Sequence, residues 1–274
     1  MTDWLAVPDN VVDGVRERWP DRAEPWLSTA GEALAELCAE FNGRPRDVLH
    51  ARYGYVVTVD TPDGGLVIRS SPDPDGPIQA KVSEAMAALN VAPAIHRVVV
   101  TKLATWTVMD EIQPGLPFAL TDRSVADLEA LAAPLAVLRD EPAPIVGMMS
   151  LASWIRGRLE DDYLTDMPVW QVPASDSERS AALDLLVDLD RGTEIRLCHG
   201  DASTWNLLLS SANSWVLIDP RGISGEVAYD LAVLAMKVRG RHTAAEVCRR
   251  FAAVAGIDRE RVVAWMKVAI AARV

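Results

Sequence analysis

The chain has 274 residues and 50% hydrophobic content, enough for one large core or for two modest lobes. Its formal net charge of −12 would repel nucleic acid and attract cationic ligands, although such a charge can also serve solubility alone. No run reaches the roughly 18 apolar residues of a membrane span. The opening MTDWLAVPDN lacks the features of a signal peptide, so we expect a cytoplasmic protein without a membrane partner.

The first 112 residues predict a small β-rich lobe. Apolar residues recur at three-to-four spacing from Trp26 to Phe41, which predicts an amphipathic helix. A second helix is compatible with residues 78–89. Runs rich in β-branched residues predict strands at 56–60, 66–70, 95–100 and 105–112. The turn-forming sequence TPDGG joins the first two of these strands into a hairpin.

The remainder, residues 113–274, predicts a larger and mostly helical lobe. Pro114 to Pro117 break the chain, and helical patterns follow at 121–139, 151–160 and 175–190. The last of these opens with Ser175 and Glu178 at capping-box spacing. Strand texture returns between residues 195 and 219, and two or three helices close the chain.

The stretch LCHGDASTWNLLLSSANSWVLIDPRG, residues 197–222, places strongly polar residues among short apolar runs. A buried polar group without a partner costs about 2 to 7 kcal/mol on transfer scales, so these residues need a shared task or water. Phosphoryl transfer from ATP requires such a set. Asp201 would accept the proton of the acceptor hydroxyl, and Asn206 and Asp219, joined by a short hairpin, would hold Mg²⁺.

These motifs resemble the aminoglycoside phosphotransferase family. The likeness is carried by HGD at 199–201, Asn206, IDP at 218–220, Gly225 and YDLA at 229–232. The nearest branch is the streptomycin 6-kinase and hydroxyurea-resistance group, to which IDPRG and the opening VPD and PWL are similar. The resemblance implies an α+β, two-lobed, protein-kinase-like fold that uses ATP or GTP with Mg²⁺. It also implies that His199 holds the loop, while Asp230 satisfies backbone groups of the same loop.

The nucleotide site is expected in residues 1–112. The kinase pattern requires a lysine on the third strand paired with a helix glutamate, and here Arg69 and Glu84 occupy those places. Arginine is larger than lysine and binds in a fixed geometry, so it does not simply replace lysine. The alternative is that Arg69 does not bind phosphate and only forms ion pairs on the surface. Adenine would be bound through the main chain of Asp110, Glu111 and Ile112, which lead out of the lobe.

The acceptor pocket is expected in residues 113–274. An acidic cluster of Glu160, Asp161, Asp162 and Asp166 would suit ammonium or guanidinium groups, and Trp265 would offer a platform for a cation or a sugar. The alternative is a solvated helix end beside a core tryptophan.

We therefore expect a phosphotransferase with an alcohol group as acceptor, and the resemblance suggests a streptomycin-type aminoglycoside kinase that confers antibiotic resistance. One alternative is a kinase for another metabolite or natural product, because one fold supports many acceptors. A second alternative, motivated by Arg69, is a nucleotide-binding protein without turnover.

Overall fold

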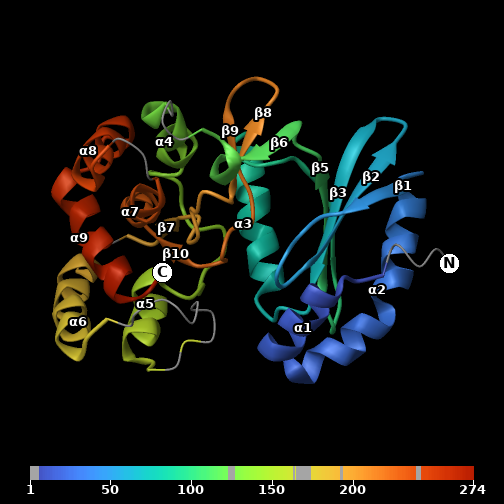
Figure 1. Ribbon diagram of the computed structural model, residues 1–274, viewed down its shortest axis with the longest axis horizontal. Helices are drawn as coiled ribbons and strands as arrows, with labels where there is room; N and C mark the ends of the chain where they lie inside the picture. The colour runs from blue at the N-terminus through green and yellow to red at the C-terminus, as the bar shows by residue number, and fades with distance from the viewer. Residues whose placement is uncertain (1–5, 123–126, 163, 165–173, 192–193, 239–241) are drawn as a thin grey trace. The chain divides into compact units, whose positions relative to one another are not determined.

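The computed structural model describes residues 6–122, 127–162, 164, 174–191, 194–238 and 242–274. The chain divides into two compact units, Met1–Ile112 and Gln113–Val274 (Figure 1). No helix in the described part is both long and apolar enough to cross a membrane.

The first unit is a five-stranded antiparallel sheet with three helices. Its elements are α1 (Asp9–Arg18), α2 (Pro20–Glu40), β1 (Arg44–Val48), β2 (Tyr55–Thr61), β3 (Gly64–Ser71), α3 (Gly76–Ala88), β4 (Ile95–Val100) and β5 (Thr105–Asp110). The strand order is β1-β2-β3-β5-β4. Strand β3 lies at the centre of this order and pairs with β2 on one side and β5 on the other, so its residues are held in register from both sides.

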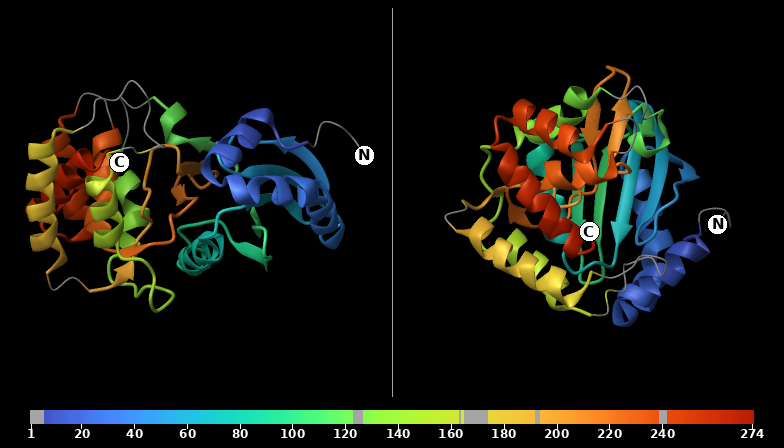
Figure 2. Two further views of the ribbon diagram at one scale, coloured as in Figure 1. Left: turned by 90° about the horizontal axis from the view of Figure 1, so that it is seen from below. Right: turned by 60° about the vertical axis from the view of Figure 1, so that its left-hand side comes forward.

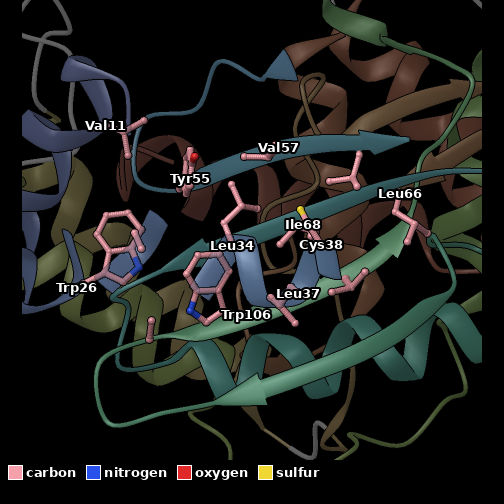
Figure 3. Close-up of a cluster of buried hydrophobic side chains, with 14 of the residues drawn as sticks. Val11, Trp26, Leu34, Leu37, Cys38, Tyr55, Val57, Leu66, Ile68 and Trp106 are labelled. Atoms are coloured by element: carbon pink, nitrogen blue, oxygen red, sulfur yellow. The ribbon is translucent and has the colours of Figure 1, made fainter. Parts of the chain in front are cut away.

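The core of this unit lies between the sheet and α1 and α2 (Figure 3). Ile68 of β3 is paired with Val57 of β2 and Val108 of β5, and all three side chains are buried on the same face. Trp26 of α2 is fully buried there and donates its indole N–H to Ser70 Oγ at 3.1 Å. Because side chains alternate along a strand, the intervening residues of β3 lie on the opposite face.

The second unit is mostly helical and carries two small sheets. Its elements are β6 (Pro114–Pro117), η2 (Phe118–Leu120), α4 (Leu128–Val137), α5 (Leu151–Glu160), α6 (Asp176–Asp190), β7 (Arg196–Leu197), β8 (Leu207–Ser210), β9 (Trp215–Leu217), β10 (Ser224–Gly225), α7 (Val227–Lys237), α8 (Ala244–Ala255) and α9 (Arg259–Ala271). The sheet orders are β6-β8-β9 and β10-β7.

Helix α7 forms the centre of this unit. Every residue from 227 to 235 is buried, and α4, α8 and α9 pack against the helix. In both views of Figure 2, α6 (yellow) lies beside α9 (red), in agreement with their packing contacts. A helix that is buried on all sides is held rigidly by its neighbours. Helix α7 begins shortly after the candidate catalytic segment, residues 197–222, and so gives that segment a fixed support.

Most of the expected elements are confirmed, including the 56–60 and 66–70 hairpin, the three closing helices and the capping box of Ser175 and Glu178. The expected helix 121–139 is shorter, because α4 covers residues 128–137, while 123–126 lie outside the described residues. Pro114–Pro117, expected as a chain break, is strand β6 paired with β8. Proline is tolerated there because β6 is an edge strand and each proline lies at one of its ends.

Candidate active site

The loop from Asp201 to Asn206 is a closed turn. The main-chain carbonyl of Asp201 accepts hydrogen bonds from the amide of Ser203 at 2.7 Å and from Asn206 Nδ2 at 2.9 Å. The amide of Asn206 donates to Ser203 at 3.0 Å. These bonds place the side chains of Asp201 and Asn206 on one short, rigid segment, as the sequence predicted.

The β8–β9 hairpin brings Asp219 to the same segment. Leu207 is paired with Leu217 in the hairpin, and the amide of Ile218 donates to the carbonyl of Asn206 at 3.0 Å. Asp219 is the next residue, and its backbone is left-handed, with φ at 58°. Aspartate and asparagine tolerate this conformation better than other residues with a Cβ atom.

Asp230, in the first turn of α7, holds the residues that lead into this turn. Its carboxyl group is fully buried and accepts hydrogen bonds from the amides of His199 and Gly200, each at 2.8 Å. Burial raises the pKa of Asp230 to about 7, while the two amide donors oppose that rise. The expectation that Asp230 satisfies backbone groups of the catalytic loop is confirmed.

Replacing Asp230 by alanine is therefore expected to destabilise the protein. Two buried amides would lose their acceptor, and each unsatisfied donor costs about 1 to 3 kcal/mol, so the loss should be about 3 kcal/mol. Urea unfolding of the variant and the wild type measures this difference. Asp184→Ala, at an exposed position of α6, is the matched control and should stay within about 0.5 kcal/mol. Equal stability of the two variants would contradict the structural role of Asp230.

His199 is a structural residue of the loop. Its ring is fully buried, with Nε2 at 2.8 Å from the carbonyl of Ile218, and Nδ1 accepts the amide of Asp201 at 3.2 Å. Nε2 therefore carries the proton, because Nδ1 is an acceptor. Burial lowers the pKa of His199 and so favours the neutral ring. Both ring nitrogens hold backbone, which confirms the role of a loop-holding residue.

Gly200 allows the turn to approach Ile223, the residue before β10. Its φ is 79°, and a Cβ atom would lie 2.8 Å from the side chain of Ile223. Only glycine avoids both the backbone strain and this contact.

Arg221 and Trp154 are part of the site, although sequence reasoning did not select them. Arg221 Nη2 lies 3.5 Å from Asp201 Oδ2, and its guanidinium lies 4.5 Å from the centre of the Trp154 ring. The amide of Arg221 donates to the carbonyl of His199 at 2.9 Å. Arg221 thus has both its backbone and its side chain fixed beside the candidate base. Arg221 could have been selected from the sequence, because it lies in the IDPRG motif. Trp154 lies in α5, where no motif pointed to it.

The donor set suits a metal that is shared with a ligand. No group of three or more His, Cys, Asp or Glu side chains in the described ranges could hold a metal by itself. Asn206 and Asp219 offer one amide and one carboxylate, which fits Mg²⁺ bound mainly by phosphate oxygens and water. Nδ2 of Asn206 donates a hydrogen bond to the carbonyl of Asp201, which fixes the orientation of the side-chain amide. Its oxygen, Oδ1, would therefore be the atom that binds Mg²⁺.

In the first unit, Arg69 lies in β3 between Val56 of β2 and Thr107 of β5. It is on the face of the sheet opposite to the α2 core. Glu84, its expected partner, forms an ion pair with Lys81 at 2.7 Å along α3. The pairing of Arg69 with Glu84 stays a prediction.

The expected adenine-binding segment begins at Asp110, the last residue of β5. The amide of Asp110 donates to the carbonyl of Ala94 at 3.0 Å, and the amide of Glu111 donates to that of Gly65 at 2.9 Å. Both amides are thus engaged within the unit. Ile112 is therefore the remaining candidate among the three for an amide donor to adenine.

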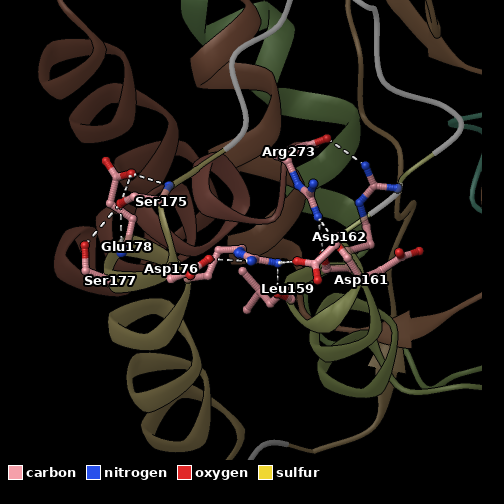
Figure 4. Close-up of polar contacts among 10 residues, drawn as sticks. Leu159, Asp161, Asp162, Ser175, Asp176, Ser177, Glu178 and Arg273 are labelled. Atoms are coloured by element: carbon pink, nitrogen blue, oxygen red, sulfur yellow. Dashed lines mark hydrogen bonds and ion pairs between the residues drawn. The ribbon is translucent and has the colours of Figure 1, made fainter.

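The acidic residues at the end of α5 are engaged by arginines. Asp162 forms an ion pair with Arg179 at 2.7 Å (Figure 4), and Glu160 lies 3.7 Å from Arg156 on the same helix. These ion pairs offset part of the negative charge that the expected cluster would offer to a cationic acceptor.

Of the two other members of the cluster, Asp161 and Asp166, the structure describes only Asp161. The main-chain carbonyl of Asp161 accepts a hydrogen bond from Arg273, near the C-terminal end (Figure 4). Asp166 lies outside the described residues.

Trp265 is a core residue. Its ring is 2% exposed, packs edge-on against Tyr229 and donates its N–H to Glu226 at 2.6 Å. The pocket that it lines has a volume of about 40 Å³, enough for one or two waters but not for an acceptor. The structure therefore favours the alternative of a core tryptophan over an open platform.

Comparisons with solved structures agree with this fold. An aminoglycoside-3'-phosphotransferase of type VIII is 18% identical, with 87% of this chain and 97% of that chain covered and a TM-score of 0.58. A choline/ethanolamine kinase family protein from Mesorhizobium loti is 17% identical, with 86% and 81% covered and a TM-score of 0.62. A thermostable mutant of aminoglycoside phosphotransferase APH(4)-Ia, in a ternary complex with ADP and hygromycin B, is 16% identical, with 85% and 87% covered and a TM-score of 0.58. These likenesses confirm the expected kinase-like fold.

The sequence comparison identifies the family. No curated protein matches the sequence at a significant level. A family model described as aminoglycoside/hydroxyurea antibiotic resistance kinase matches residues 122–272, more than half of the chain, including the whole segment from Asp201 to Asp230. The chain therefore belongs to the aminoglycoside/hydroxyurea antibiotic resistance kinase family, whose members transfer a phosphate group to a hydroxyl of their acceptor.

Proposed function

We propose that the protein is an ATP-dependent kinase of a streptomycin-type aminoglycoside. The observation that carries this proposal is the closed turn that fixes Asp201 and Asn206, with Asp230 beneath it and Asp219 on the adjoining hairpin. A carboxylate and an amide held in this way are the groups that phosphoryl transfer requires. The net charge of −12 favours a cationic acceptor.

Asp201 is the residue that orients the acceptor. Its side chain is 31% exposed, so a hydroxyl can reach it, and a carboxylate oxygen accepts the hydroxyl proton as the phosphate is transferred. The guanidinium of Arg221 lies beside Oδ2 of Asp201 and so limits the rotation of this carboxylate. Asn206 and Asp219 would hold Mg²⁺, which offsets the negative charge of the phosphates.

The nucleotide would be bound by the first unit, with the Ile112 amide toward adenine and Arg69 toward the phosphates. Solved relatives of the fold contain ADP, which supports a nucleotide in this role. The guanidinium of Arg69 offers several donors in a fixed plane and therefore suits phosphate oxygens.

Replacing Arg69 by alanine is expected to lower kcat/KM for ATP by about tenfold or more while leaving the melting temperature nearly unchanged. Arg69→Lys should retain at least the activity of the wild type, because lysine is the residue that the kinase pattern has at this place. Steady-state kinetics with varied ATP test both variants, and Arg97→Ala on β4 provides an exposed arginine control. Wild-type kinetics in both Arg69 variants would assign Arg69 to the surface.

An acceptor screen tests the proposed function. The protein is incubated with ATP and Mg²⁺ and with streptomycin, hygromycin B, spectinomycin, choline or ethanolamine, and ADP release is followed by mass measurement of the product. A mass increase of one phosphate on streptomycin is expected. Phosphorylation of choline or ethanolamine alone would support a metabolite kinase, and nucleotide binding without any product would support the alternative without turnover.

A further inference from the structure

The catalytic turn carries an exposed tryptophan between its two functional residues. Trp205 directly precedes Asn206 and is 57% exposed, whereas the loop residues Ala202 and Thr204 are buried. Of the tryptophans in the described ranges, Trp205 is the one whose ring is exposed. A single exposed apolar residue is common on protein surfaces, so its exposure alone carries no meaning. The position of Trp205 is informative, because it directly precedes Asn206, the candidate metal ligand.

The backbone on both sides of Trp205 is fixed. The carbonyl of Thr204 accepts the amide of Ala119 at 2.9 Å, and the amide of Asn206 donates to Ser203 at 3.0 Å. The side chain of Asn206 is also bonded to the Asp201 carbonyl. The indole therefore starts from a rigid frame, so that little backbone entropy is lost when a ligand contacts it.

The acceptor is the ligand that suits an indole at this place. A metal and phosphates held at Asn206 would be charged and hydrated, and the negative face of an aromatic ring does not attract phosphate. Adenine is expected at residues 110–112 of the first unit. The acceptor must bring a hydroxyl to Asp201, only four residues before Trp205, so its ring lies near the turn.

We propose that Trp205 stacks against the acceptor and selects ring-shaped alcohols that carry a cationic group. An indole face attracts both the C–H face of a sugar or cyclitol ring and an ammonium or guanidinium group. This inference rests on the proposed function and adds a residue that determines the substrate class.

Arg221 strengthens the selection by repulsion. Its guanidinium lies 3.5 Å from Asp201 and is stacked on Trp154, so a cation of the acceptor is disfavoured there. The same cation is favoured over the Trp205 ring. Together the two residues would orient a cationic acceptor with respect to the carboxylate that receives its hydroxyl.

The test compares Trp205→Ala and Trp205→Phe with the wild type, using streptomycin and hygromycin B as probes. Trp205→Ala is expected to raise the acceptor KM about tenfold, to leave the KM for ATP within twofold and to leave the melting temperature unchanged. Trp205→Phe should recover most of the loss, because it retains an aromatic face. Ile270→Ala, an exposed apolar residue of α9, is the matched control and should change neither KM.

Binding titrations keep this test separate from the test of function. The Kd of each probe is measured by calorimetry without ATP for the wild type and the Trp205 variants. If the wild type binds a probe but transfers no phosphate, the proposed function fails, and a tenfold higher Kd for Trp205→Ala still supports the inference. An unchanged acceptor constant, a rise in the KM for ATP alone or a wild type that binds no probe would overturn it.

Discussion

Asp201→Asn is expected to remove nearly all phosphate transfer while leaving nucleotide binding intact. The asparagine keeps the size and the hydrogen-bonding main chain of the turn but cannot accept the hydroxyl proton, and loss of a general base typically costs about 10² to 10⁴ in rate. Because Asp201 acts on the acceptor, the Kd for ATP should stay within about twofold. Single-turnover transfer and equilibrium ATP binding measure the two quantities separately.

The control for this variant is Asp184→Asn, which makes the same chemical change at an exposed position of α6. It should retain wild-type transfer. The turn is closed by the main-chain carbonyl of Asp201 and not by its carboxylate, so Asp201→Asn should also fold normally. Transfer by Asp201→Asn within a few-fold of the wild type would remove Asp201 from the proposed mechanism.

The catalytic segment could be predicted because its geometry is local. Only four residues lie between Asp201 and Asn206, and a short hairpin separates Asn206 from Asp219, so spacing and turn chemistry determine how they meet. The support from His199 and Asp230 could also be anticipated, since both belong to the same run of motifs. Strand β6 could not, because its proline residues read as a chain break and its partner β8 is far along the chain.

The acceptor side was predicted less well, for a physical reason. The acidic residues after α5 were chosen by their closeness in sequence, but the arginine that pairs with Asp162 comes from α6. Trp265 was chosen as an aromatic residue on a helix, and its burial depends on Tyr229 and Glu226. Such long-range partners are set by tertiary packing, which a periodic pattern does not specify. For the same reason, the exposure of Trp205 became visible only in the structure.

The second large effect is expected for Asp219, the candidate carboxylate ligand of Mg²⁺. Its left-handed backbone, with φ at 58°, makes alanine an unsuitable replacement, because alanine would add backbone strain to the loss of the carboxylate. Asparagine tolerates the same backbone conformation and has nearly the same shape. Asp219→Asn therefore removes the charge with little effect on the fold.

In the wild type, ATP affinity should rise as Mg²⁺ is added, whereas in Asp219→Asn it should respond weakly, because the two remaining amide oxygens are neutral and hold Mg²⁺ poorly. We expect kcat to fall by about 100-fold or more, since the charge of the transferred phosphate would lose its counterion. Titration of Mg²⁺ against ATP affinity measures the first effect, and Asp184→Asn again serves as the exposed control. A wild-type Mg²⁺ dependence in Asp219→Asn would place the metal on other ligands. Loss of ATP affinity without Mg²⁺ as well as with it would instead mean that the substitution disturbs the hairpin, which the unfolding curve of the variant would show directly.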